Sequence, residues 1–228
     1  MELTERKKYS RLVWPVALAL LVLMCSGVFT NAEASASTEN KRGLLALGST
    51  APDFRLQDVV TGREVALSDF KNQKALLVAI VCRHGPFVQH IKTGLAQLGK
   101  DYEKRGLAIV AISANDPKGY PEDAPEKLKE MAVEAGFVFP LLFDGTQAVA
   151  KEYTAVATPD FFLFDQERKL VYRGQFDDSR PQKRIPVTGK DVRMAINAVL
   201  GGRPVSQDQR PSVGCSIKWK PGNSPSYR

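Results

Sequence analysis

The stretch ALLVAIVCRHGPFVQH, residues 75–90, joins an uninterrupted apolar run to a cysteine and then to a proline. The run covers residues 75–81 and contains no polar position, which is typical of a strand buried on both faces of a sheet. Pro86 is tolerated in the first turn of a helix, so the change from strand to helix falls just after Cys82. The sequence therefore predicts a cysteine at the carboxyl end of a buried strand, beside the start of a helix.

The residues that follow predict a helix over residues 86–104, with Gly106 past its end. A second apolar run, LAIVAIS at residues 107–113, comes directly after it. Two apolar runs that flank an amphipathic helix are typical of parallel strands in a β-α-β unit. Six apolar positions at helical spacing form the face that we expect to pack on the sheet: Phe87, Val88, Ile91, Leu95, Leu98 and Tyr102.

Further elements are expected on both sides of this unit. Before it, APDFRLQD and EVAL predict two strands of a hairpin across a Thr-Gly turn. After it, we expect helices near residues 125–135 and 189–200, a short helix in TQAVAKEY, and strands in PLLFD, FFLFD and KLVYRGQF. The predicted fold is α/β, with a central mixed β-sheet flanked by helices, an N-terminal β-hairpin and an irregular C-terminal tail.

The N-terminal residues have the pattern of a secretory signal peptide. Basic residues precede an apolar run at residues 12–24, and small residues follow from Ala32 onwards. We predict cleavage after Ala32, so that residues 1–32 are a signal peptide and the mature protein is exported to the periplasm or another extracytoplasmic compartment without stable membrane association. An uncleaved anchor is the alternative, but the run is short and Pro15 interrupts it.

Three regions are expected after the signal peptide. Residues 33–46 are small and polar and predict a linker, and residues 47–200 hold the periodic segments of the folded domain. Residues 201–228 are rich in proline, glycine and serine and have no period. Cys215, Ile217 and Trp219 nevertheless indicate that part of this tail packs on the domain, because apolar and aromatic side chains favour burial.

Composition and charge restrict the classes of partner. The chain has 228 residues, 43% of them hydrophobic and 25% charged, which is ordinary for a globular domain. Its net charge of +7 is mild, and the basic residues are scattered among acidic ones, so a nucleic-acid partner is not expected. Removal of the signal peptide takes Cys25 with it and leaves Cys82 and Cys215 in a compartment where disulfides persist.

Several longer stretches resemble a known family. GSTAPDFRLQD and LSDFKNQKALLVAIVC resemble the opening of the alkyl hydroperoxide reductase/thiol-specific antioxidant (AhpC/TSA, redoxin) group. YPEDAPEKL, ATPDFFLFD, LVYRGQFDDSRP, PVTGKD and PSVGCSIKWKPGN resemble its peroxiredoxin-like branch, and together the motifs span residues 47–223. The resemblance implies a thioredoxin-like fold, redox-active cysteines and oxidoreductase or antioxidant activity. It also implies a cis bond between Thr158 and Pro159, against the active cysteine, where neighbouring backbone pairs with an extended substrate.

The chain departs from this branch at its active-site motif. The branch normally reads Cys-Asn-His-Cys-Pro where this chain has Cys-Arg-His-Gly-Pro at residues 82–86, so Gly85 replaces the second cysteine. Gly85 matches the position of the peroxide-reducing cysteine of peroxiredoxins, and peroxide reduction at Cys82 would therefore need a non-standard geometry. Many relatives also have a cysteine where this chain has Ala157, whereas Cys215 in PSVGC is retained.

These observations predict an exported redoxin-type thiol-disulfide oxidoreductase or antioxidant-like protein with a single active-site cysteine. Its substrates would be protein or small-molecule disulfides or thiols, it would use an external thiol reductant, and no cofactor is expected. The positive end of the helix and the nearby positive potential of Arg83 and His84 predict a lowered pKa for the Cys82 thiol. A lone thiolate forms a mixed disulfide that a second thiol must resolve. The predicted site comprises Cys82 as nucleophile, Cys215 as candidate resolving thiol, and Arg83, His84, Thr158 and Pro159 in substrate binding.

Other interpretations stay open from the residues alone. Cys82 can serve as a small buried hydrophobe, or Cys82 and Cys215 can form a structural disulfide. The chain can also be a non-catalytic module that binds an extended peptide beside Pro159, or a weak peroxidase. No metal site is predicted, because the two histidines, His84 and His90, are six residues apart and fall on separate sides of a helix.

Overall fold

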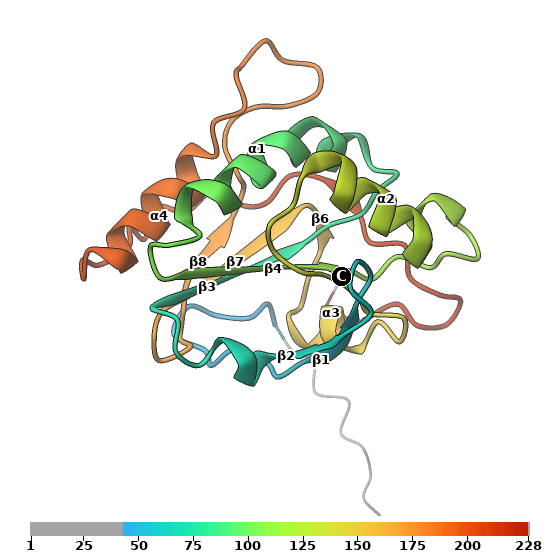
Figure 1. Cartoon of the computed structure of the whole chain (residues 1–228), viewed down its shortest axis with the longest axis horizontal. Coiled ribbons are helices and arrows are strands. Elements are labelled where there is room, and N and C mark those ends of the chain that lie inside the picture. Colours follow the sequence, from blue (N-terminus) through green and yellow to red (C-terminus); the bar gives the residue numbers. More distant parts are fainter. Residues whose placement is uncertain (1–42, 228) are drawn as a thin grey trace, which may run out of the picture. The chain divides into compact units, whose positions relative to one another are not determined.

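The central sheet of the molecule contains seven strands and is mixed (Figure 1). The strands are β1 (Arg55–Asp58), β2 (Glu64–Ala66), β3 (Ala75–Ile80), β4 (Leu107–Ser113), β5 (Leu141–Phe143), β7 (Asp160–Phe164) and β8 (Leu170–Gly174). Their order is β2-β1-β5-β4-β3-β7-β8, in which β3, β4 and β5 are parallel and the remaining pairs are antiparallel. The mixed sheet and the leading hairpin β1-β2 confirm the predicted fold class.

Helices cover both faces of this sheet. The helices are α1 (Pro86–Tyr102), α2 (Pro125–Ala135), α3 (Ala148–Glu152) and α4 (Lys190–Leu200), with 3-10 turns η1 (Leu67–Phe70) and η2 (Pro121–Asp123). Figure 1 shows α1, α2 and α4 on one side of the sheet and α3 on the other. Helix α1 ends two residues earlier than the predicted bound of 104, because the chain turns there toward Gly106, whose φ of 89° ends the helical path.

The structure describes residues 43–227 as a computed structural model. The predicted signal peptide and residues 33–42 of the predicted linker lie outside these described residues. Within residues 43–227, none of the helices combines the length and the apolarity needed to cross a lipid bilayer.

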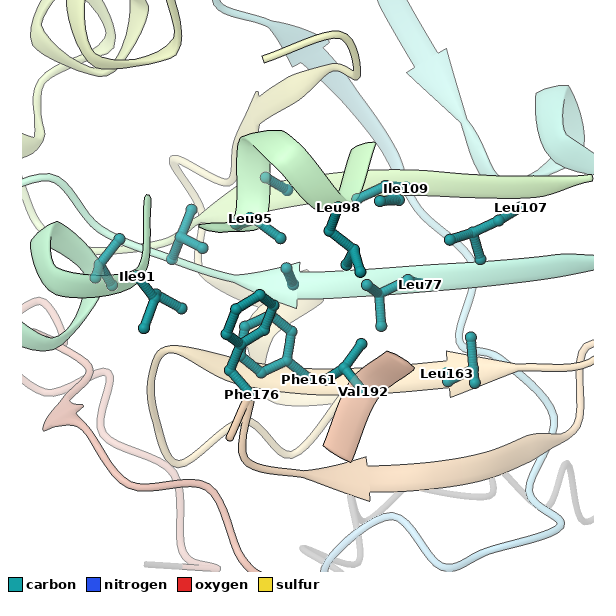
Figure 2. Close-up of a cluster of buried hydrophobic side chains, with 14 of the residues drawn as sticks. Leu77, Ile91, Leu95, Leu98, Leu107, Ile109, Phe161, Leu163, Phe176 and Val192 are labelled. Atoms are coloured by element: carbon teal, nitrogen blue, oxygen red, sulfur yellow. The ribbon is translucent and has the colours of Figure 1, made fainter. Parts of the chain in front are cut away.

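Strand β3 contributes to the hydrophobic core on both faces of the sheet, and all six of its residues are buried. Alternate side chains of a strand point to opposite faces, and two separate clusters result. Leu77 and Ala79 belong to the cluster under α1, α2 and α4, which Figure 2 shows, whereas Leu76 and Val78 belong to the cluster on the side of α3. Burying each leucine of this kind stabilises the fold by roughly 1.5–3 kcal/mol. The strand is therefore fixed from both faces, and so is the point where it ends, next to Cys82.

The C-terminal tail is irregular, but hydrogen bonds hold it against the domain. Its strand β9 (Cys215–Ser216) pairs antiparallel with β6 (Ala157–Thr158) in a separate two-stranded sheet. On either side of β9, the Ser212 hydroxyl donates to Asp160 at 2.6 Å and the Lys218 backbone N–H donates to Asn115 at 2.8 Å. The tail thus crosses the carboxyl end of the sheet beside Cys82.

Candidate active site

Cys82 lies two residues past the end of β3 and is fully buried. Its Sγ is 3.1 Å from Thr158 Oγ1, which brings the thiol against β6 although the two residues are far apart in sequence. Thr158 is itself buried, and the peptide bond between Thr158 and Pro159 is cis. The structure therefore brings Cys82 together with Thr158 and Pro159, as predicted for the site.

The pKa of the Cys82 thiol differs from the sequence-based expectation. This pKa is raised to about 12, chiefly by burial and to a smaller extent by the nearby Asp123 carboxylate, although hydrogen bonds from Thr158 and the Gly85 backbone act to lower it. The expectation of a lowered pKa is wrong because the loss of hydration outweighs the helix N-terminus. Cys82 is therefore a protonated thiol at neutral pH.

Gly85 and Cys215 border the same small space. Gly85 precedes α1 and is buried, and a Cβ atom added there would lie 2.7 Å from Cys82 Sγ and 4.0 Å from Cys215 Sγ. Both cysteines are free thiols, and Cys215 is only partly exposed. The tail thus supplies a sulfur atom next to the position where the family motif has its second cysteine.

Arg83 and His84 do not contribute their charges to the thiol in the way that the sequence suggested. The Arg83 guanidinium pairs with Glu122 and, at 3.5 Å, with Glu130. The His84 ring stacks on Tyr120 with 4.8 Å between ring centroids and donates from Nδ1 to Asp123. Arg83 therefore faces η2 and α2, and His84 is held between Tyr120 and a buried carboxylate.

Asp123 is the site residue that the sequence analysis missed. It is fully buried at the end of η2, and its Oδ1 accepts hydrogen bonds from the backbone N–H groups of Arg83 at 2.6 Å and His84 at 3.1 Å. Its Oδ2 accepts from Asn115 Nδ2 at 2.7 Å and from the His84 ring. A usable signal was present, because YPEDAP follows the carboxyl end of a predicted strand that neighbours the strand of Cys82, and loops at that edge meet in space.

One grouping of potential metal ligands occurs within residues 43–227. Donor atoms of Cys82, His84 and Asp123 lie within 4.8 Å of one another. Both Asp123 oxygens already accept hydrogen bonds, and the Cys82 thiol is bonded to Thr158. We therefore describe His84 and Asp123 as a hydrogen-bonded pair beside the Cys82 thiol, and identify no metal ligand among the three residues.

The strand edge expected to receive substrate is occupied by the tail. Cys215 is the antiparallel partner of Thr158, and Ser216 is the partner of Ala157. The resemblance implied that backbone beside Pro159 pairs with an extended substrate, and in this structure that backbone pairs with the chain's own C-terminal segment. An external strand would have to displace β9 to reach Thr158.

The comparisons with known proteins agree on the family. The family described as "AhpC/TSA family" matches residues 47–173. The thiol-disulfide oxidoreductase ResA of Geobacillus thermodenitrificans is 30% identical over 164 residues, which cover 72% of this chain and 87% of that protein.

Solved structures give the same fold. An uncharacterized conserved protein from Geobacillus kaustophilus is 51% identical, with a TM-score of 0.77 over 78% of this chain and 95% of that one. The thioredoxin domain of a thiol-disulfide oxidoreductase from Bacteroides vulgatus is 22% identical, with a TM-score of 0.51 over 65% of this chain and 96% of that one. At this identity the second likeness concerns the fold alone, and it is the thioredoxin fold.

Proposed function

The chain belongs to the AhpC/TSA family, and from this premise we propose that it is an exported thiol-disulfide oxidoreductase with Cys82 as its nucleophile and Cys215 as its resolving thiol. The observation that carries the proposal is the position of both sulfur atoms around Gly85, at 2.7 Å and 4.0 Å from the point where a Cβ would be. A single active-site cysteine otherwise depends on an external thiol to complete each turnover. A relative that is 30% identical carries the name thiol-disulfide oxidoreductase.

The reaction proceeds in two exchange steps. The Cys82 thiolate attacks one sulfur of a substrate disulfide, which forms a mixed disulfide and releases the other substrate sulfur as a thiolate. The Cys215 thiolate then attacks Cys82 Sγ, forms the Cys82–Cys215 disulfide and releases the second substrate thiolate. Two protein thiols are oxidised and one substrate disulfide is reduced to two thiols, and an external thiol reductant restores the protein.

Deprotonation of Cys82 needs a base, because burial keeps the thiol protonated. We assign this role to His84, because one of its ring nitrogens lies within 4.8 Å of Cys82 Sγ. Its Nδ1 donates to the buried Asp123, so that Nε2 remains to accept a proton. Asp123 would fix the orientation of the ring, and the histidine would take the Cys82 proton as the disulfide approaches.

Export is part of the proposal and rests on the N-terminal sequence. Basic residues, a short apolar run and small residues at Ala32 form the pattern of a signal peptide. Expression of the full chain, followed by fractionation and N-terminal sequencing of the secreted form, tests this part. A mature N-terminus directly after Ala32 is expected, and a product that begins at Met1 in the membrane fraction would contradict it.

The catalytic part is tested by the reduction of insulin disulfides with dithiothreitol as the external thiol. The wild-type protein is expected to accelerate the reaction, and Cys82→Ser to abolish the acceleration. Reduced Cys215→Ser, mixed with insulin after removal of dithiothreitol, is expected to accumulate a mixed disulfide between Cys82 and an insulin chain, which mass spectrometry identifies. An acceleration that persists in Cys82→Ser would overturn the assignment.

A non-catalytic binding module is the second candidate. The full burial of Cys82 and the glycine at the second motif position favour it. This candidate predicts no acceleration by the wild-type protein and no mixed disulfide in Cys215→Ser. The same insulin experiment therefore separates the two functions.

A further inference from the structure

The edge of β6 is the strand edge that lies against the candidate nucleophile. Thr158 contributes its Oγ1 to Cys82 Sγ at 3.1 Å and its backbone to the pairing with Cys215. Extended peptides bind proteins by adding a strand to such an edge, with main-chain hydrogen bonds for affinity and side-chain pockets for specificity. An extended chain that brings a sulfur atom to Cys82 therefore has β6 as its docking strand.

The tail fills this position with a cysteine of its own. Cys215 stands opposite Thr158, so that its sulfur reaches the space beside Cys82 and Gly85. With the tail in place, Cys82 has no exposed surface. The tail thus occupies the place of a cysteine-bearing strand, beside a thiol that has no exposed surface.

The residue before Cys215 lies too close to β6 to carry a side chain. A Cβ atom added at Gly214 would lie 2.3 Å from Thr158 O and 2.6 Å from Thr158 C. These are backbone atoms, which cannot rotate away as a flexible side chain does, and real carbon–oxygen contacts are longer than about 3 Å. A strand that docks in the same way needs glycine directly before its cysteine.

The residue two positions after Cys215 is an apolar anchor. Ile217 is 2% exposed and belongs to the buried cluster on the α3 side of the sheet. Burying a side chain of this size removes its apolar surface from water and so stabilises the docked strand. A docking strand therefore gains most from an aliphatic residue at this position.

From this geometry we propose that β9 is a displaceable mimic of the substrate, and that the substrate is an extended polypeptide with glycine directly before its reactive cysteine and an aliphatic residue two positions after it. The proposal rests on the proposed function for its chemistry and names the substrate class of that site. Substrate and tail exchange places on β6. The substrate strand displaces β9 and its disulfide reacts with Cys82; the returning tail then brings Cys215 to the mixed disulfide and expels the substrate strand.

The first test measures how well the tail covers Cys82. Alkylation of Cys82 by iodoacetamide is followed by mass spectrometry of its peptide, in the full chain and at one mildly alkaline pH. Gly214→Ala lifts β9 and is expected to raise the rate about tenfold or more, since labelling of a buried group follows local opening. Gly119→Ala is the matched control, because nothing lies within 4 Å of a Cβ added there.

The second test uses a synthetic peptide with the sequence of residues 211–219 and serine in place of the cysteine. Binding is measured by fluorescence anisotropy. The Gly214→Ala protein, whose edge is free, is expected to bind the peptide about tenfold more tightly than the wild type. Peptides with alanine in place of the glycine, or with aspartate in place of the isoleucine, are expected to lose this binding.

The outcomes separate the two proposals. Equal alkylation rates and equal peptide affinities in wild type and Gly214→Ala would overturn the mimic, even where insulin reduction depends on Cys82. Faster alkylation and selective peptide binding without any insulin reduction would support the mimic and overturn the proposed function. Should Gly214→Ala fail to fold, Ile217→Ser removes the second anchor and is expected to give the same two effects.

Discussion

At the scale of single residues, the protonation state of Cys82 depends more on the surroundings of its thiol than on its place in a motif. The helix N-terminus favours a thiolate. Full burial and the Asp123 carboxylate oppose it, and the pKa of about 12 shows which effect is larger. The Cys82 thiol is therefore protonated at neutral pH in the folded protein.

This raised pKa predicts the pH dependence of Cys82 labelling. In a Cys215→Ser background, the alkylation rate is expected to increase about tenfold per pH unit from neutral to alkaline pH without a plateau, because the thiolate fraction rises in this way below the pKa. When the same protein is unfolded in urea, the alkylation rate is expected to level off once the pH passes 9.0, the ordinary pKa of a cysteine thiol. A plateau near neutral pH in the folded protein would show that the thiol is activated in the ground state.

The sign of the effect on stability follows from the same shift. The folded-state pKa of about 12 lies above the reference value of 9.0, so the folded protein holds the proton more tightly than the unfolded chain. The contribution of Cys82 to stability is complete below pH 9.0 and is lost as the pH rises through about 12.

Gly85 gives a second prediction at this scale. A Cβ there would lie 2.7 Å from Cys82 Sγ, close to the separation of about 3 Å between a Cβ and the far sulfur of a disulfide. The φ of −76° accepts any side chain. Oxidised Gly85→Cys is therefore expected to contain a disulfide between Cys82 and the introduced thiol, identified by peptide mapping.

Gly119→Cys is the control for this substitution, since its thiol has no neighbour within 4 Å of its Cβ and stays free. Exclusive formation of a Cys82–Cys215 disulfide in oxidised Gly85→Cys would contradict the prediction. Faster insulin reduction by Gly85→Cys would further indicate that the native site differs from the family motif mainly by one thiol.

At the scale of elements, η2 holds the segment that connects β3 to α1. Asp123 accepts hydrogen bonds from two successive N–H groups of this segment, from Arg83 and His84, and from Asn115 after β4. Three elements therefore meet at one carboxylate. The segment that carries Cys82 is positioned by a residue from a different part of the chain.

Asp123→Asn is expected to lower the free energy of unfolding by about 2–3 kcal/mol, measured by denaturant unfolding. The amide can replace one oxygen but turns an N–H₂ toward Asn115 and the His84 ring, which are both donors. Glu122→Gln is the control in the same 3-10 turn, and loss of its exposed ion pair with Arg83 is expected to cost less than about 1 kcal/mol. Equal losses of unfolding free energy in the two variants would show that Asp123 stabilises the fold no more than the exposed carboxylate of Glu122 does.

The elements themselves were largely predictable from the sequence. The apolar run 75–81 and the bounds 125–135 of α2 agree with the structure because each has a strong local signal, a continuous buried strand in one case and a Pro start with a Gly end in the other. Asp123 was not predicted, because its partners are contributed by two other segments. The local sequence pattern indicates at which edge of the sheet the loop of Asp123 lies, but it does not indicate which residues of other segments bind the Asp123 carboxylate.

At the scale of the whole molecule, the C-terminal tail marks the limit of sequence reasoning. It has no period, and its order comes from single contacts such as Ser212 with Asp160 and Lys218 with Asn115. Cys215, Ile217 and Trp219 indicated that the tail packs on the domain, but the register of Cys215 with Thr158 follows only from the folded structure. The second sulfur of the site is therefore a tertiary feature.

The proximity of Cys215 to Cys82 predicts that the thermal stability of the protein depends on the redox state of these two cysteines. A Cys82–Cys215 disulfide closes a loop of more than a hundred residues, and the loss of chain entropy in the unfolded state stabilises a fold with such a loop by about 4–5 kcal/mol when the bond is unstrained. The oxidised protein is expected to melt at a higher temperature than the reduced protein in calorimetry, and Cys215→Ser to melt at the same temperature under both conditions. An oxidised form no more stable than the reduced form would mean that the bond stores strain in the folded state, which would favour disulfide transfer over a permanent staple.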